Sequence, residues 1–253
     1  MATKKTELAK IEESSLALST ELPEWLRDKG GNRGAENVGV DDIIIPRIEI
    51  VQSLSPARKK SDPAYIEGAE EGMLFNNVTR ELYGASVIVV PVYYSKQYLI
   101  WKDRKAGGGT GGFRGAYNSL GEAHEQIQTL GEEALDVAET AQHFCLIHSQ
   151  DKWEEAVVSM SKSKLKISKR WNSLMRLTNT DSFSRAYKLA STEESNARGE
   201  TYYNFSITSL GFVPANVFVR AEELYHRIRQ GGIKVSSDFD NDSAETVSTG
   251  SEY

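Results

Sequence analysis

The stretch that decides the fold covers residues 157–178 and reads VVSMSKSKLKISKRWNSLMRLT. It opens as an apolar run typical of a buried strand, passes through serines at alternate positions, and continues with helical spacing. Apolar side chains then share one helix face, at Ile167, Trp171, Leu174, Met175 and Thr178. The other face carries the cations Lys162, Lys166, Lys169, Arg170 and Arg176. The pattern predicts a half-buried helix with a cationic outer face.

Basic charge is concentrated around this helix. Residues 160–190 contain eight Lys or Arg residues and a single acid, Asp181, in a chain whose net charge is −6. Residues 235–253 hold five acids and no base, so they supply −5 of that total. A basic patch on the body and an acidic tail that can compete for it indicate interaction with a polyanion. An ordinary solvated surface helix is the alternative explanation.

Length and composition are those of an ordinary soluble chain. The 253 residues, 39% hydrophobic and 26% charged, allow one large domain or two small ones. No apolar run approaches the ~20 residues of a membrane span, and no signal-peptide core follows Met1. A single cysteine, Cys145, fits a reducing compartment. We therefore expect a cytoplasmic protein with no membrane segment.

The chain divides into an arm, a body and a tail. Residues 1–40 have weak helical character that a glycine-rich break ends, and we expect a partly ordered arm. Residues 41–234 form the body, and residues 235–253 form a disordered acidic tail. In the body, strand patterns arrive as hairpins rather than alternating with helices. This order favours a mainly β fold, an antiparallel barrel or sandwich with inserted helices.

The expected elements of the body follow from residue periodicity. β-branched or alternating runs predict strands, and helical spacing predicts three helices. The expected strands are 43–51, a hairpin around 73–83, 85–94, 140–148, 153–160, 183–190 and 201–210. The expected helices are 119–137, 161–178 and 217–229.

A second basic stretch surrounds a glycine-rich segment, residues 107–115. It lacks the Gly-Lys-Ser/Thr of a phosphate-binding loop and the strand-to-helix setting of a dinucleotide site, so we expect a flexible loop. Aromatic residues alternate with cations on both sides of it. Single-stranded nucleic-acid sites have this composition, because rings stack on bases while Lys and Arg follow phosphates. Core or sheet-face positions for these aromatics are the alternative.

Motifs of catalysis and metal binding are absent from the sequence. It contains no Gly-x-Ser-x-Gly, no His-Glu-x-x-His and no kinase signature, and its histidines do not have the spacing of zinc ligands. Cys145 lies in an apolar run and is expected to be a buried structural thiol. We therefore expect no enzyme activity, no cofactor and no metal.

Several segments together resemble one family. They are residues 41–48 (DDIIIPRI), 72–79 (GMLFNNVT), 89–92 (VVPV), 161–172 (SKSKLKISKRWN) and the acidic tail ending in Tyr253. Over roughly residues 41–253 the chain resembles bacteriophage single-stranded DNA-binding proteins of replication and recombination modules. The resemblance implies an OB-like barrel, binding without sequence preference, and a tail that recruits replication enzymes or blocks the groove. The tail lacks the dense Asp run and Pro-Phe end of bacterial relatives, which puts host recruitment in doubt.

We therefore expect a non-enzymatic single-stranded DNA-binding protein of phage replication or recombination, working in the host cytoplasm. Its partners are single-stranded DNA and, through the tail, replication or recombination proteins; homo-oligomerisation stays open. A strand-annealing recombination protein and a protein-interaction or virion assembly component are the alternatives. The predicted contacts are Tyr94, Tyr98, Trp101, Lys102, Arg104, Lys105, Phe113, Arg114, Lys162, Lys164, Lys166, Lys169, Arg170 and Trp171.

Overall fold

The computed structural model describes residues 45–103, 112–196 and 198–230, together with Gly34. Apart from Gly34, these residues lie in one compact unit, Val40–Tyr253. The rest of the expected arm and the whole expected tail lie outside the described residues. The described chain is mainly antiparallel β with inserted helices, as the hairpin pattern predicts.

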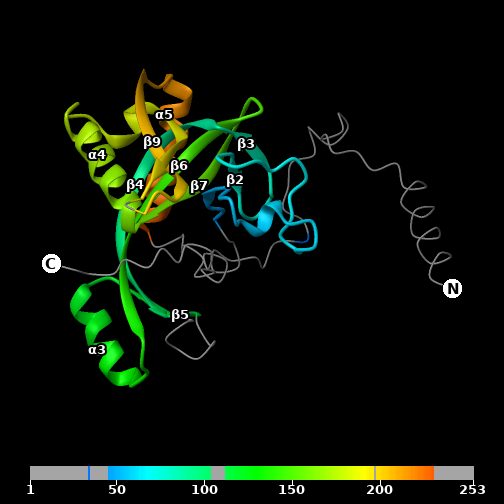
Figure 1. Ribbon diagram of the computed structural model, residues 1–253. Helices are drawn as coiled ribbons and strands as arrows, with labels where there is room; N and C mark the ends of the chain where they lie inside the picture. The colour runs from blue at the N-terminus through cyan, green and yellow to red at the C-terminus, as the bar shows by residue number, and fades with distance from the viewer. Residues whose placement is uncertain (1–33, 35–44, 104–111, 197, 231–253) are drawn as a thin grey trace. The chain divides into compact units, whose positions relative to one another are not determined.

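Strand β4 (Ser86–Lys102) is central to a six-stranded sheet (Figure 1). The order is β7-β6-β4-β8-β9, and β5 pairs with the far end of β4. β6 follows β4 almost throughout, whereas β8 pairs with residues 86–89 of β4 and β5 with residues 98–102. The other strands are β5 (Gly112–Tyr117), β6 (Leu135–Ser149), β7 (Lys152–Ser161), β8 (Arg185–Ser195) and β9 (Thr201–Phe212).

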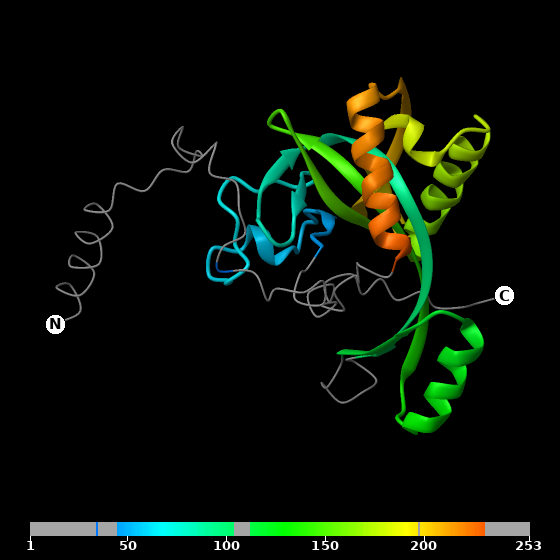
Figure 2. The same cartoon turned by 180° about the vertical axis from the view of Figure 1, so that it is seen from behind.

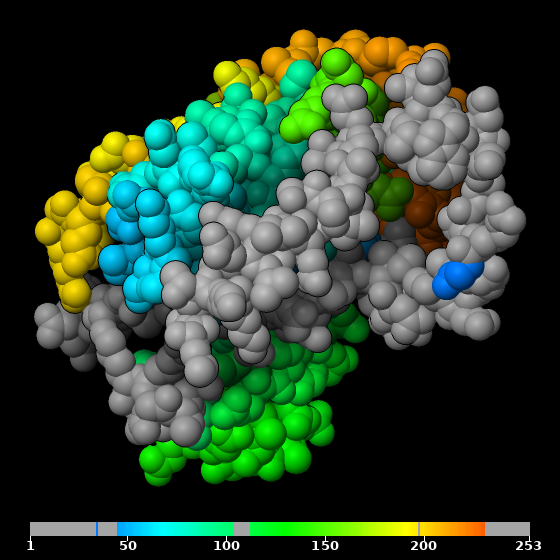
Figure 3. Space-filling view, turned by 90° about the vertical axis from the view of Figure 1, so that its right-hand side faces the viewer, coloured from blue at the N-terminus to red at the C-terminus, as the bar shows by residue number. Residues whose placement is uncertain are grey.

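A smaller antiparallel sheet of three short strands precedes the large one. Gln52 joins it to β9, because its side chain donates to the Tyr203 carbonyl (2.8 Å) and accepts from the Tyr203 amide (2.9 Å). Gly72 has a φ of 80° and lies under the Tyr203 ring, where a Cβ would come within 2.6 Å of ring carbon. Figure 3 shows this segment, blue to cyan, against the teal surface of β4. Its strands are β1 (Ile48–Ile50), β2 (Leu74–Asn76) and β3 (Leu82–Gly84).

Two helices pack on opposite faces of the large sheet. α4 (Leu165–Arg176) packs through Trp171 on the face that carries Val89 and Cys145. α5 (Ala215–Arg229) packs on the face that carries Val90 and Leu146, and Figure 2 shows it lying across the strands. Successive side chains of a strand alternate between faces, so neighbouring valines of β4 contribute to two different cores.

β4 and β6 continue beyond these cores and carry β5 and helix α3 (Leu120–Leu130) at their far end (Figures 1 and 2). We call β5, α3 and the strand ends paired with β5 the extension. Leu99, Ile100 and Ala123 are buried within it. α3 begins after Ser119, whose hydroxyl accepts a hydrogen bond from the Glu122 amide (3.2 Å).

Sequence periodicity located most elements but misplaced some boundaries. The strands expected at 140–148, 153–160, 183–190 and 201–210 and the helix expected at 217–229 are confirmed within a few residues. The helix expected to reach residue 137 ends at Leu130, because Gly131 takes a left-handed conformation (φ 60°) that stops it. Residues 112–115 were expected in a loop and instead begin β5. The described strands form two open sheets and no closed barrel.

Candidate nucleic-acid interface

Trp171 fixes which face of α4 turns outward. Its side chain is fully buried, stacks on the His143 ring at 4.4 Å between centroids with an interplanar angle of 19°, and meets the Tyr187 ring edge-on at 5.8 Å. Ser168, one turn earlier, is buried beside it. The predicted apolar face of the helix is therefore its packed face. Trp171 itself, predicted as a base-stacking residue, belongs to the core and presents no ring face to solvent.

The opposite face of α4 is cationic, as its spacing predicts. Its side chains are exposed, and α4 contains no acidic residue. Within the described part of the chain, no ion pair engages Lys162, Lys169, Arg170 or Arg176. We call one set of exposed cations the α4 ridge: Lys162, Lys166, Lys169, Arg170 and Arg176.

The residues at the N-terminus of α4 are unfavourable for helix stability. Lys164 occupies the N-cap position and no side chain caps the first turn. Lys162 and Lys166 flank it, so cations gather at the positive end of the helix dipole, where acidic residues are stabilising and basic residues are not. The Lys164 ammonium lies 5.6 Å from the Phe205 ring centroid. Neither capping nor the helix dipole therefore accounts for the lysines at this end.

Lys166 differs from the rest of the ridge because it is tied to the sheet. Its Nζ lies 2.9 Å from Oε2 of Glu194. The same oxygen accepts hydrogen bonds from the Tyr202 hydroxyl (2.8 Å) and the Asn204 amide (3.0 Å). The hydrogen bond with Glu194 raises the pKa of Lys166. Lys166 therefore anchors the start of α4 to β8 and β9.

Tyr94 of β4 lies next to His143, on the side of the large sheet that α4 covers. Its ring lies 5.1 Å from that of His143, on which Trp171 stacks, and the residue is 36% exposed. Lys96 and Tyr98 follow at alternate positions of β4 and share its face. Lys96 forms an ion pair with Glu139 (2.8 Å). Lys96 was absent from the predicted contacts, although the Tyr-x-Lys-x-Tyr alternation signals it.

The predicted contacts of the extension form a second group. Trp101 and Phe113 are partners in the β4–β5 ladder, and their rings meet edge to face at 5.6 Å. Lys102 and Arg114 lie beside them and share one carboxylate. Arg104 and Lys105 lie outside the described residues.

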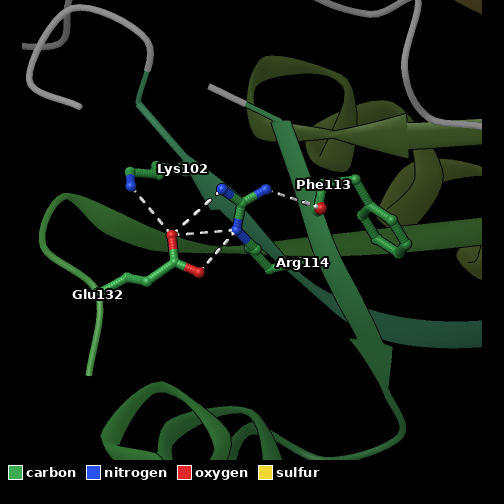
Figure 4. A network of polar contacts seen from close by, with 4 residues as sticks. All are labelled: Lys102, Phe113, Arg114 and Glu132. Carbon is green, nitrogen blue, oxygen red and sulfur yellow. Dashed lines mark hydrogen bonds and ion pairs between the residues drawn. The ribbon is translucent and has the colours of Figure 1, made fainter. Parts of the chain in front are cut away.

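Glu132 holds both described cations of this group (Figure 4). Its carboxylate lies 3.0 Å from Lys102 Nζ and 3.0 Å from Arg114 Nε. Arg114 Nη1 also donates to the Phe113 carbonyl (3.3 Å). Hydrogen bonds from Arg114 and Lys102 lower the pKa of Glu132, so it stays ionised. Two cations against one carboxylate leave a net positive charge that a phosphate would compensate.

The structure thus sorts the predicted contacts into two patches. The ridge patch consists of the α4 ridge and Tyr94. The extension patch consists of the ring pair Trp101 and Phe113 and the cation pair Lys102 and Arg114; Trp101 and Lys102 are successive residues of β4, so their side chains point to opposite faces of the sheet. Tyr94 and Lys102 are eight residues apart on β4, or about 26 Å at 3.3 Å per residue. Lys96 and Tyr98 lie between them along the same strand.

Comparison with known proteins gives a family assignment. The sequence matches the Pam3 phage gp34-like protein family over residues 12–234. The chain belongs to this family. No curated protein and no solved structure matches it. Membership in the Pam3 phage gp34-like family makes this a phage protein.

Two kinds of feature are absent from the part of this family member that the structure describes. No group of three or more His, Cys, Asp or Glu side chains there is placed to hold a metal ion. No helix there has the length and apolarity needed to cross a membrane.

A buried titratable residue, His143, contacts Tyr94 of the ridge patch. Its Nε2 lies 2.8 Å from the Ser168 hydroxyl, and no described residue hydrogen-bonds its Nδ1. Burial lowers the pKa of His143 to about 3. Below pH ~6.5 the unfolded chain therefore takes up a proton that the folded chain does not.

We expect the free energy of unfolding to fall by about 2 kcal/mol between pH 7 and pH 5 through His143 alone. This contribution is fully present above the unfolded pKa and is lost progressively as the pH falls toward the folded pKa. His143→Gln keeps a donor for Ser168 but cannot titrate, so its stability curve should be flatter by that amount. Urea unfolding of both proteins across this range is the measurement. Parallel curves would contradict the assignment.

Proposed function

We propose that this protein binds single-stranded DNA without sequence preference and acts without catalysis, in phage replication or recombination in the host cytoplasm. One observation carries the proposal: four exposed cations, which no described residue engages in an ion pair, lie on and beside a helix that contains no carboxylate. Charged side chains on an ordinary surface helix usually include both signs and pair along it. A one-sign ridge is suited to a polyanion.

The exposed ring of Tyr94 and the half-buried ring of Tyr98 favour a single strand over a duplex as that polyanion. A ring gains stacking energy only on a base whose face is open, and duplex bases are already stacked. The Tyr94 ring lies 5.1 Å from that of His143, on which Trp171 of α4 stacks, and Tyr98 follows on the same face of β4. Phosphates on the ridge and bases on these rings make a combined contact that a single strand satisfies.

The proposal keeps the acidic tail as a competitor for the ridge and as a docking segment for replication or recombination proteins. It does not depend on an OB-like barrel. An open sheet that displays cations and rings along one strand supplies the same contacts as a barrel groove. Strand annealing would use the same contacts and differs only in what happens when complementary strands meet.

The ridge can be tested with the double variant Lys169→Ala/Arg170→Ala. Each phosphate contact to a single strand contributes about −0.7 to the slope of log K against log salt. We expect weaker binding of a labelled oligonucleotide and a slope less steep by about 1.4. Fluorescence anisotropy over a salt series measures both.

Lys59→Ala/Lys60→Ala is the matched control, because it removes two exposed cations from another segment. An equal loss in both double variants would indicate a general charge effect and remove the ridge from the interface. No affinity of the unmodified chain for any oligonucleotide would end the nucleic-acid proposal and favour an assembly component.

Stacking by Tyr94 is tested separately from charge. Tyr94→Ala should weaken single-strand binding by about 1–3 kcal/mol and leave the salt slope unchanged, because a ring rather than a phosphate contact is lost. Tyr94→Phe keeps the ring and should bind nearly as well as the unmodified chain. Anisotropy titrations at one salt concentration and their salt series distinguish the two effects. Equal losses in both variants would argue for the hydroxyl instead of stacking.

The extension patch is tested by releasing its cations. Glu132→Gln removes the charge that Lys102 and Arg114 share, so we expect tighter binding and a salt slope steeper by about 0.7 for one added phosphate contact. Glu71→Gln is the control, since it releases ion-paired Arg58 in another segment. Identical salt series for Glu132→Gln and the unmodified chain would leave the extension outside the interface.

A further inference from the structure

The strands at the two ends of the large sheet's strand order differ in how they are protected. β7 and β9 are the ends of the strand order, so each presents one row of backbone amides and carbonyls away from its partner strand. An exposed row of this kind is a template for another strand, and proteins usually block it with charge, proline or a covering segment.

β7 is blocked in the usual ways. The Val157 amide donates to the Pro46 carbonyl (2.8 Å). The Arg220 guanidinium donates to the Trp153 carbonyl (2.6 Å). The strand also carries three charged residues: Lys152, Glu154 and Glu155.

β9 has no such protection over its second half. Its sequence, TYYNFSITSLGF, contains neither a charge nor a proline. Gln52 occupies the outer edge at Tyr203, and the Phe205 amide donates to the Asn204 side chain (2.9 Å). Beyond Phe205, no described strand pairs with the outer side of β9. Residues 207–212 are therefore an unprotected edge.

The register shows which backbone groups this edge presents. The Tyr203 amide and carbonyl both bond to Gln52, so they point away from β8. Alternate residues of an antiparallel strand point the same way, and the ladder is regular as far as the pair Tyr187–Ser209. Ile207 and Ser209 thus present their amides and carbonyls outward. Beside them Leu210 is 53% and Phe212 70% exposed.

We propose that β9 pairs with β9 of a second copy of this chain, antiparallel and with the two-fold axis at Thr208. This register sets Ile207 of each copy opposite Ser209 of the other, and each such pair exchanges two backbone hydrogen bonds. The dimer is a continuous sheet across both copies.

A second copy fits this edge for reasons of symmetry and charge. Antiparallel pairing of two identical strands is itself a two-fold arrangement, so it closes as a dimer and leaves no free end. Near a two-fold axis every side chain meets itself or a close neighbour, and a charged residue would meet its own charge. β9 has none. Thr208 meets Thr208, and exposed Leu210 packs beside Ser206 of the other copy.

The experiment uses opposite charges at the proposed axis. Thr208 is exposed, so Thr208→Lys and Thr208→Glu are accommodated in a single copy. Sedimentation velocity and light scattering without DNA should show self-association of the unmodified chain. Each variant alone should dimerise at least tenfold more weakly, because like charges meet at the axis. An equimolar mixture of the two variants should dimerise again.

Thr201→Lys, at the start of the same strand and away from the axis, is the control and should dimerise as the unmodified chain does. Circular dichroism and thermal melts verify that all variants fold. A monomeric unmodified chain, variants that still dimerise, or a mixture that stays monomeric would each overturn the proposed pairing. Capture of a foreign strand by a monomeric chain is among these overturning results. Lys169→Ala/Arg170→Ala should leave the dimer intact, so failure of this proposal is distinguishable from failure of DNA binding.

Discussion

The stacking of Trp171 on His143 is the contact on which the arrangement of the candidate interface depends. It holds α4 to β6 at a single helix phase, and Ser168 reinforces that phase through its hydrogen bond to His143. Because Trp171 faces inward, the ridge cations within α4, which are Lys166, Lys169, Arg170 and Arg176, are left exposed. The same histidine also contacts the ring of Tyr94. The buried pair Trp171 and His143 thus determines which face of α4 is exposed and contacts the ring of Tyr94.

Sequence periodicity predicted this much of the fold because α4 and the hairpins are locally determined. Three- and four-residue spacing identified the packed face of α4, and alternation identified β6 to β9. What it could not predict depends on contacts between distant residues. Two of the six residues of β5 are glycines, which weaken its strand propensity, and the strand forms by pairing with β4. The open sheet likewise reflects tertiary packing that no local pattern encodes.

The candidate site likewise contains residues that a local pattern predicts and residues that only long-range contacts bring together. The ridge residues were predicted because four of them lie on one helix, α4, and Lys162 lies in the 3-10 turn just before it. The role of Glu132 was not, since it lies 30 residues from Lys102 in sequence and meets it only through the β4–β6 pairing. Trp171 was included among the stacking residues because composition near the ridge is aromatic and basic, although its helical phase pointed to the core. The helical phase of a residue is therefore better evidence for its burial than the composition of the surrounding sequence, where the two disagree.

The proposed preference for single-stranded DNA also follows from the stiffness of the paired strands β4 and β6. Tyr94 of the ridge patch and Lys102 of the extension patch lie on one strand, β4, about 26 Å apart, and β6 is paired with β4 along this interval. Their spacing is therefore fixed by backbone hydrogen bonds and does not adapt to a ligand. A duplex is itself stiff, with a persistence length of about 150 base pairs, and meets both patches only if its straight backbone coincides with them. A single strand bends to follow the twist of β4 and can place a base against Tyr94 as it passes.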